Sequence, residues 1–129
     1  MTPTSGPLEG RRILLVEDEY FIADDMAEEF KRSGAEIVGP AATVCHAIQH
    51  IRGATRLDGA VLDINLHGEM VYPVADLLEE QRVPFVFSTG YANPSIPARY
   101  AQVTRCEKPV EPSKVAQALF ATGLATGKE

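Results

Sequence analysis

Short apolar runs alternate with longer amphipathic segments from residue 12 onward, and this alternation restricts the fold more than any other feature of the chain. The runs are rich in Val, Ile, Leu and Phe, which is typical of strands covered by helices on both faces. The intervening segments repeat apolar residues at the spacing of one helix face. This pattern predicts an α/β domain with a parallel sheet. We expect strands at residues 12–16, 36–39, 59–62, 85–88 and 103–106.

A helical segment is expected after each of these strands. Thr43 is placed to cap the second helix, and the third is expected at residues 69–81. The fourth segment contains Pro94 and Pro97. Because proline lacks a backbone donor and restricts the residue before it, we expect a short or irregular helix there. The fifth helix is expected at residues 112–123.

The length of 129 residues fits one domain, so a sensor fused to an effector is excluded. Residues 1–10 contain prolines and glycines and one isolated leucine, and we expect them to form a flexible N-terminal leader. The folded domain is expected at residues 11–123. Residues 124–129 are expected to form a flexible C-terminal tail.

The charge balance disfavours several kinds of partner. Twelve Lys and Arg residues against eighteen Asp and Glu give a net charge of −6, which repels nucleic acid and anionic lipid. No apolar stretch approaches the roughly 18 residues of a membrane span. The two cysteines, Cys45 and Cys106, form neither a disulfide framework nor a metal-ligand spacing, which favours a cytoplasmic setting.

Polar residues follow the expected strands at the point where each strand ends. In a doubly wound sheet, ligands bind beyond the carboxyl ends of the strands, so these residues are expected to meet in one crevice. They are Glu17 and Asp18 after the first strand, Asp63 and Asn65 after the third, Thr89 after the fourth and Lys108 after the fifth.

Three carboxylates in one crevice require positive charge. Like charges about 4 Å apart repel by roughly 4 kcal/mol per pair at an effective dielectric constant near 20. Mg²⁺, which prefers oxygen ligands and retains water, together with Lys108 would offset this repulsion. A carboxylate beside Mg²⁺ is a competent nucleophile toward a phosphoryl group, with Thr89 donating a hydrogen bond to a phosphoryl oxygen. The expected product is an aspartyl phosphate.

Four segments carry a family resemblance: ILLVEDE at residues 13–19, VLDINL at 61–66, FSTGY at 87–91 and EKP at 107–109. In order and spacing they resemble the receiver domain of bacterial two-component response regulators, over residues 11–122. The resemblance implies a flavodoxin-like (βα)5 fold, a doubly wound parallel sheet of strand order 2-1-3-4-5 inside a three-layer sandwich.

The resemblance also implies a Mg²⁺ site. Asp63 and Asp18 would bind the ion directly, and Glu17 would bind it mainly through water. The backbone carbonyl of Asn65 would complete the protein's share of the ligands.

The phosphoryl chemistry implied by the resemblance centres on Asp63, which would accept a phosphoryl group from the phosphohistidine of a sensor histidine kinase. Thr89 would bond a phosphoryl oxygen, and Lys108 would pair with the phosphoryl charge. The Lys108–Pro109 peptide bond is typically cis in this family.

Residues 84–91 (PFVFSTGY) resemble a stand-alone subgroup of receivers marked by Phe-Xaa-Phe-Ala-Thr-Gly-Tyr, with Ser88 in place of Ala. That subgroup pairs with a distinct class of sensor kinases. Most receivers carry Tyr or Phe three residues before the lysine, whereas this chain has Arg105. We therefore hypothesise that Tyr91 replaces the usual mobile aromatic, and that Asn65 and Tyr91 flank the path of hydrolytic water.

The function predicted is that of a single-domain response regulator, with no enzymatic role beyond its own phosphorylation and dephosphorylation. Since no effector domain follows residue 123 in this sequence, output is expected through contact with a downstream regulator, a histidine phosphotransfer protein or the kinase. The alternative is a phosphorylation-independent adaptor with a receiver fold, which Arg105 leaves open. An aspartyl-phosphate hydrolase is disfavoured because it needs a second acid at the position of Asn65. A nucleotide-binding protein is disfavoured because it needs Gly, Ser or Thr at the positions of Glu17 and Asp18.

Three residues outside these motifs receive ordinary interpretations. His67 lies close to the expected site, and a solvated loop histidine is favoured over a residue that influences access or local pH dependence. Arg99 and Tyr100, next to the weak fourth helix, are expected at the surface, either in ordinary surface packing or as part of a partner surface.

Overall fold

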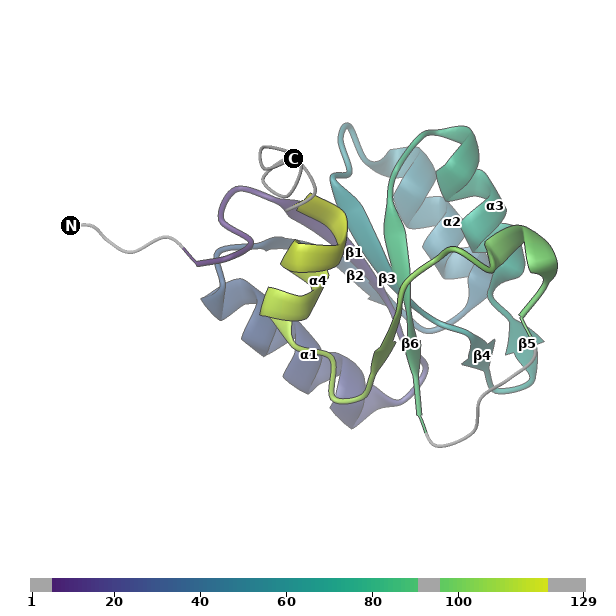
Figure 1. Cartoon of the computed structure of the whole chain (residues 1–129), viewed down its shortest axis with the longest axis horizontal. Coiled ribbons are helices and arrows are strands. Elements are labelled where there is room, and N and C mark those ends of the chain that lie inside the picture. Colours follow the sequence, from purple (N-terminus) through teal and green to yellow (C-terminus); the bar gives the residue numbers. More distant parts are fainter. Residues whose placement is uncertain (1–5, 91–95, 121–129) are drawn as a thin grey trace.

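The structure is a computed structural model, and it describes residues 6–90 and 96–120. Its centre is a five-stranded parallel sheet of order β2-β1-β3-β6-β7 (Figure 1). This arrangement confirms the predicted fold class and strand order. The strands are β1 (Arg12–Val16), β2 (Glu36–Ala41), β3 (Gly59–Asp63), β6 (Phe85–Thr89) and β7 (Arg105–Glu107).

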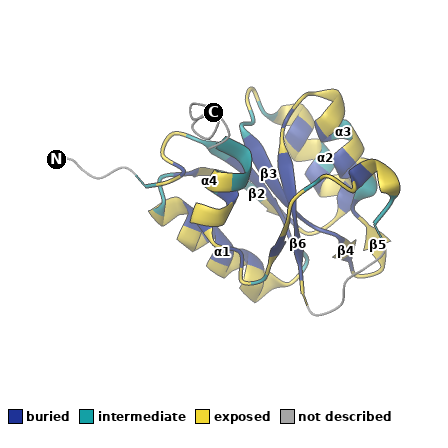
Figure 2. Cartoon of the chain, viewed as in Figure 1, coloured by how far each residue is buried: buried dark blue, intermediate teal, exposed yellow. Residues whose placement is uncertain are grey.

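Helices cover both faces of the sheet, and the sheet separates the hydrophobic core into two clusters (Figures 1 and 2). On one face, Met26 and Phe30 of the first helix pack with Val115 of the last against the sheet. On the other face, the second and third helices pack with Leu62 and Phe87. The helices are α1 (Tyr20–Arg32), α2 (Val44–Gly53), α3 (Tyr72–Glu80) and α4 (Pro112–Phe120).

The expected helices are confirmed in part. The Thr43 side chain accepts a hydrogen bond from His46 N at 3.1 Å, as expected of the residue that caps α2. The fourth segment contains only a short 3-10 helix, Ala98–Tyr100, within its described residues. Helix α4 begins at Pro112 as predicted, while its predicted end near residue 123 lies outside the described residues. No helix in the described ranges is long and apolar enough to cross a membrane.

The predicted start of the third helix at Glu69 is wrong. A small antiparallel hairpin, β4 (Asn65–Leu66) and β5 (Glu69–Met70), lies between β3 and α3. Its connecting residues, His67 and Gly68, have φ of 54° and 91°, as the two central residues of a type I′ turn require. Because positive φ values interrupt a helix, α3 begins only at Tyr72.

The predicted leader is also wrong for residues 6–10. Leu8 is fully buried in the core cluster beneath α1, and its backbone N–H donates to Ser33 O at 3.0 Å. Gly10 N donates to Gly34 O at 3.2 Å, and the Arg11 guanidinium lies 4.1 Å from the centre of the Phe120 ring. Burial of the Leu8 side chain removes an entire aliphatic group from water and, together with these backbone hydrogen bonds, attaches the segment to the domain. Residues 1–5 and the predicted tail at 124–129 lie outside the described residues.

Candidate functional site

Three carboxylates meet at the carboxyl end of the sheet. Glu17 and Asp18 directly follow β1, and Asp63 is the last residue of β3. These two strands are parallel neighbours in register, with Val16 opposite Leu62. One oxygen from each carboxyl group lies within 4.8 Å of the others. The sheet therefore brings together the three acids that the sequence placed at strand ends.

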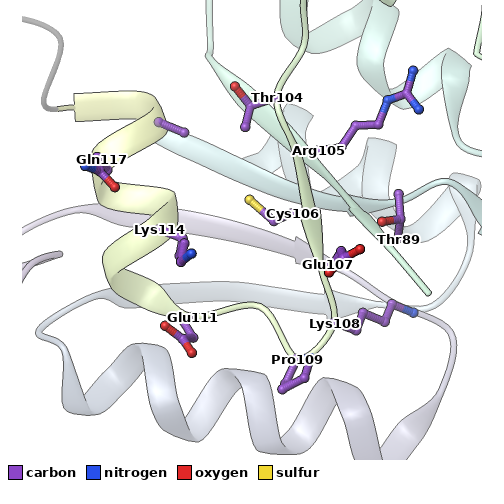
Figure 3. Close-up of a pocket in the computed structure, with 11 residues that line it drawn as sticks. Thr89, Thr104, Arg105, Cys106, Glu107, Lys108, Pro109, Glu111, Lys114 and Gln117 are labelled. Atoms are coloured by element: carbon purple, nitrogen blue, oxygen red, sulfur yellow. The ribbon is translucent and has the colours of Figure 1, made fainter. Parts of the chain in front are cut away.

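Lys108 joins this acidic cluster from the far edge of the sheet. Its Nζ lies 2.9 Å from Glu17 Oε1 and 3.1 Å from Asp63 Oδ2. Its backbone N–H donates to Thr89 O at 2.9 Å, and the peptide bond to Pro109 is cis. Figure 3 shows the Lys108 side chain extending away from α4.

Thr89 completes the group at the end of β6. Its neighbour Ser88 pairs with Asp63 across the sheet, and Thr89 itself pairs with Glu107 on β7. Thr89 is 5 % exposed and is the last residue of β6, so its backbone is held by the sheet rather than by a loop. This is the placement expected of a group that donates to a substrate oxygen.

Burial raises the pKa values of two carboxyl groups in the site. Glu17 is 1 % exposed, and burial raises its pKa to about 7 despite the nearby Lys108 and the hydrogen bond from Glu19 N. Burial also raises the pKa of Asp63, again opposed by Lys108. Burial alone would lower the pKa of Lys108, but its bonds to Glu17 and Asp63 outweigh this and the pKa is raised. Glu17 and Asp63 thus share one ammonium, and this charge does not fully compensate the cluster of three carboxylates.

The donor set fits a hard divalent cation. Glu17 Oε1 is buried and accepts no hydrogen bond within the described residues, although Lys108 lies beside it as an ion-pair partner. Carboxylate oxygens from Asp18 and Asp63 lie close by. Mg²⁺ binds to one or two carboxylates and keeps several waters, so these residues suit it.

Comparison with solved structures places this geometry in a family. SdrG from Sphingomonas melonis Fr1 shares 38% sequence identity, with a TM-score of 0.73, over 86% of this chain and 94% of that one. The chain belongs to the receiver-domain family of response regulators. A BeF3-activated conformation of SdrG from Pseudomonas melonis Fr1 is 30% identical, with a TM-score of 0.66, over 95% of this chain and 97% of that one.

A more distant likeness extends to larger proteins. The response regulator PhyR from Brucella abortus is 23% identical, with a TM-score of 0.69 over 95% of this chain and 53% of the PhyR chain. At this identity the likeness shows the fold alone. No family model and no curated protein sequence matches the chain.

Three further residues were predicted to matter in this receiver: Asn65, Tyr91 and Arg105. Asn65 lies in β4, and its side-chain Oδ1 accepts a hydrogen bond from Gly68 N at 2.6 Å, which fixes the backbone beside Asp63. Arg105 is exposed on β7, the edge strand. Tyr91, the predicted substitute for the aromatic switch, lies outside the described residues.

His67 lies close to the site of this receiver, as the sequence predicted, but its contact with Asp18 was not predicted. Its side chain is 72% exposed, as expected of a loop residue, but Nδ1 lies 2.6 Å from Asp18 Oδ2. The available signal was the Leu-His-Gly-Glu sequence at residues 66–69, since a two-residue turn containing glycine between strand-like residues favours a hairpin.

Tyr100 was predicted at the surface of the receiver, and this prediction is wrong. It is 1 % exposed, and its ring stacks on Tyr72 at 5.6 Å and meets Phe87 edge-on at 5.8 Å. Its hydroxyl donates to Asp76, which also pairs with Arg99.

Proposed function

We propose that the chain is a single-domain response regulator that accepts a phosphoryl group on Asp63 in a Mg²⁺-dependent reaction. The observation that carries this proposal is the buried acidic cluster facing the ammonium of Lys108. The chain spans 94% of SdrG, which supports a single-domain protein. The BeF3-activated conformation of SdrG supports phosphoryl transfer, because BeF3 has the shape and charge of a phosphoryl group.

The cation would be held by the residues of the acidic cluster. We propose Asp18 and Asp63 as direct ligands, Glu17 as a ligand through water and the backbone carbonyl of Asn65 as a further ligand. When bound, Mg²⁺ supplies the positive charge that neutralises phosphoryl oxygens. Lys108, already held beside Asp63, supplies the second charge.

The phosphoryl step uses Asp63 as nucleophile. Asp63 Oδ2 contacts Lys108, and we propose that Oδ1 attacks phosphorus. A P–O bond to Asp63 forms as the P–N bond to a phosphohistidine breaks, and the imidazole nitrogen keeps the electron pair and takes a proton from water. Thr89 donates a hydrogen bond to a phosphoryl oxygen. Receivers are signalling proteins, and the chain would catalyse only its own phosphorylation and dephosphorylation.

The phosphoryl donor proposed is a sensor histidine kinase in the cytoplasm. Tyr20 and Phe21, at the start of α1, are 73% and 80% exposed and form an edge-on aromatic pair. They lie close in sequence to Asp18, so a protein that delivers the phosphoryl group would bury them. Exposed apolar groups beside the site favour a protein donor over a small metabolite.

The output proposed is a protein contact at the edge of the sheet. Phosphorylation adds nearly two negative charges at Asp63 and would draw Thr89 and Lys108 toward them. A pocket between β7 and α4 is lined by Arg105, Glu107 and Lys114, together with Thr89 and Lys108 (Figure 3). A downstream regulator or a histidine phosphotransfer protein would read this face.

A phosphorylation-independent adaptor is the second candidate, and the exposed Arg105 favours it. If the charged Arg105 side chain swung inward as an aromatic residue does, its burial would carry a large desolvation cost. The buried acidic cluster favours the first candidate, because an adaptor would gain nothing from carboxylates whose pKa values are raised by burial.

Intact mass spectrometry separates these functions. Incubation with Mg²⁺ and a small acyl phosphate should add one phosphoryl group to the wild-type protein and to Asp24→Asn, whose carboxylate is exposed on α1. The Asp63→Asn variant should stay unmodified. Equal labelling of Asp63→Asn, or no labelling of the wild type in a folded sample, would refute phosphoryl transfer to Asp63 and favour the adaptor.

A further inference from the structure

The hairpin after β3 holds its turn in one conformation. Leu66 is 3 % exposed and belongs to the core cluster beneath α2 and α3, which anchors the first arm. The Asn65 side chain accepts from Gly68 N across the turn, and Val71 N donates to Ile64 O at 2.9 Å beyond it. The position of His67 is therefore set by the fold rather than by a free loop.

His67 adopts a backbone conformation that side chains usually avoid. Its φ of 54° lies in the left-handed region, where histidine, asparagine and aspartate are tolerated better than most residues. A residue held in this region often marks a functional constraint. Here the conformation brings the imidazole against Asp18, which is a member of the acidic cluster.

The contact between His67 and Asp18 is specific in its atoms. Nδ1 of the imidazole lies 2.6 Å from Oδ2 of the carboxylate. The Asp18 side chain is 9% exposed and the imidazole is 72% exposed, so His67 covers the carboxylate on its solvent side. An imidazole Nδ1–H in this position donates to Oδ2 and fixes the orientation of the carboxylate.

We propose that His67 is a positioning residue for the divalent cation site and acts through Asp18. By holding Oδ2, it leaves the other carboxylate oxygen turned toward the cation and removes the cost of ordering the Asp18 side chain on binding. Partners that hold a ligating carboxylate commonly support metal affinity in this way. The inference rests on the proposed function, because it takes Asp18 to be a ligand of Mg²⁺.

The turn permits a clean set of variants. His67→Gly removes the imidazole and keeps a residue that accepts positive φ, so the turn persists. His67→Asn also suits a type I′ turn, and its Nδ2 is separated from the backbone by the same number of bonds as Nδ1 of histidine. The asparagine variant therefore restores the donor without the ring. His50→Ala, on the exposed face of α2, removes an imidazole far along the chain from the site.

Calorimetric titration with Mg²⁺ tests the inference. His67→Gly should bind Mg²⁺ about 10-fold more weakly than the wild type, while His67→Asn should bind nearly as well and His50→Ala equally well. Nitrogen NMR of the wild type should show His67 as the Nδ1–H tautomer when neutral. Equal affinity of His67→Gly and the wild type, or no recovery in His67→Asn, would overturn the positioning role.

A further variant separates this inference from the proposed function. Asp18→Asn should lose most Mg²⁺ affinity because it removes a ligand. If Asp18→Asn bound Mg²⁺ as the wild type does, the proposed cation site itself would be wrong. If Asp18→Asn lost Mg²⁺ affinity while His67→Gly did not, the proposed cation site would be supported and the positioning role of His67 would be wrong.

Discussion

Lys108 Nζ lies 3.1 Å from Asp63 Oδ2, although the two residues are 45 positions apart in the chain. The same ammonium lies 2.9 Å from Glu17 Oε1, so one cation holds carboxylates from two strands. Both acids are almost fully buried, and the Lys108 side chain is 18% exposed. The site is therefore pre-formed around Lys108, and its acidic groups outnumber this one ammonium before a metal ion binds.

Removing the ammonium should destabilise the metal-free protein. Lys108→Met leaves two buried carboxylates without their counter-ion, and we expect the free energy of unfolding near neutral pH to fall by about 3 kcal/mol. Urea unfolding monitored by circular dichroism measures this change. Lys114→Met, at an exposed position on α4, is the control and should change stability little. An equal effect of both substitutions would show that Lys108 has no special electrostatic role.

The stability of the metal-free protein should fall as the pH rises. The pKa of Glu17 is raised by burial from 4.5 to about 7, so the folded state binds more protons than the unfolded state between these values. Asp63, whose pKa is also raised, acts in the same direction. From about pH 5 to about pH 8 the free energy of unfolding should therefore drop by about 2 kcal/mol.

Two conditions should flatten this pH profile. Saturating Mg²⁺ would bind the ionised carboxylates and restore stability at the higher pH. Glu17→Gln removes the titrating group and should raise the stability of the metal-free protein at high pH. A metal-free wild type that became more stable on going from pH 5 to pH 8 would contradict the burial of Glu17.

Tyr100 should contribute to stability mainly through its ring. Tyr100→Phe removes the hydrogen bond to Asp76 and should cost about 1 kcal/mol. Tyr100→Ala removes the ring packed on Tyr72 and Phe87 and should cost about 3 to 5 kcal/mol. Equilibrium unfolding in urea compares the two variants. Similar small losses for both would mean that Tyr100 is not a core residue.

The hairpin turn should be sensitive to backbone strain at Gly68. Its φ is 91° and no atom lies within 4 Å of an added Cβ, so Gly68→Ala should cost about 1 kcal/mol through strain alone. Gly53, the last residue of α2, has equal space and no positive φ. Thermal unfolding should show that Gly53→Ala is neutral or stabilising. Destabilisation of both variants to the same extent would argue against a type I′ turn.

The sequence predicted most of the sheet because strand and helix periodicities are local. Strand β1 matches its prediction, while β2, which extends to Ala41, and the strands β3 and β6 end one or two residues later than predicted. Only β7 differs at both ends. The prediction failed at residues 65–70, where a turn with positive φ depends on two residues, His67 and Gly68, that carry no periodic signal. It failed again at Leu8, because one isolated leucine carries no pattern.

By itself, the sequence determined which carboxyl groups, which hydroxyl group and which lysine follow the parallel strands. It therefore also determined that these groups would meet at the carboxyl end of the sheet. Only the tertiary structure decided that Lys108 pairs with both Glu17 and Asp63, that His67 covers Asp18 and that Tyr100 is buried. The physical reason is that the positions of strands and helices along the chain follow from a repeated local pattern. Burial, desolvation and the pairing of individual atoms arise only when segments distant in the chain are packed together.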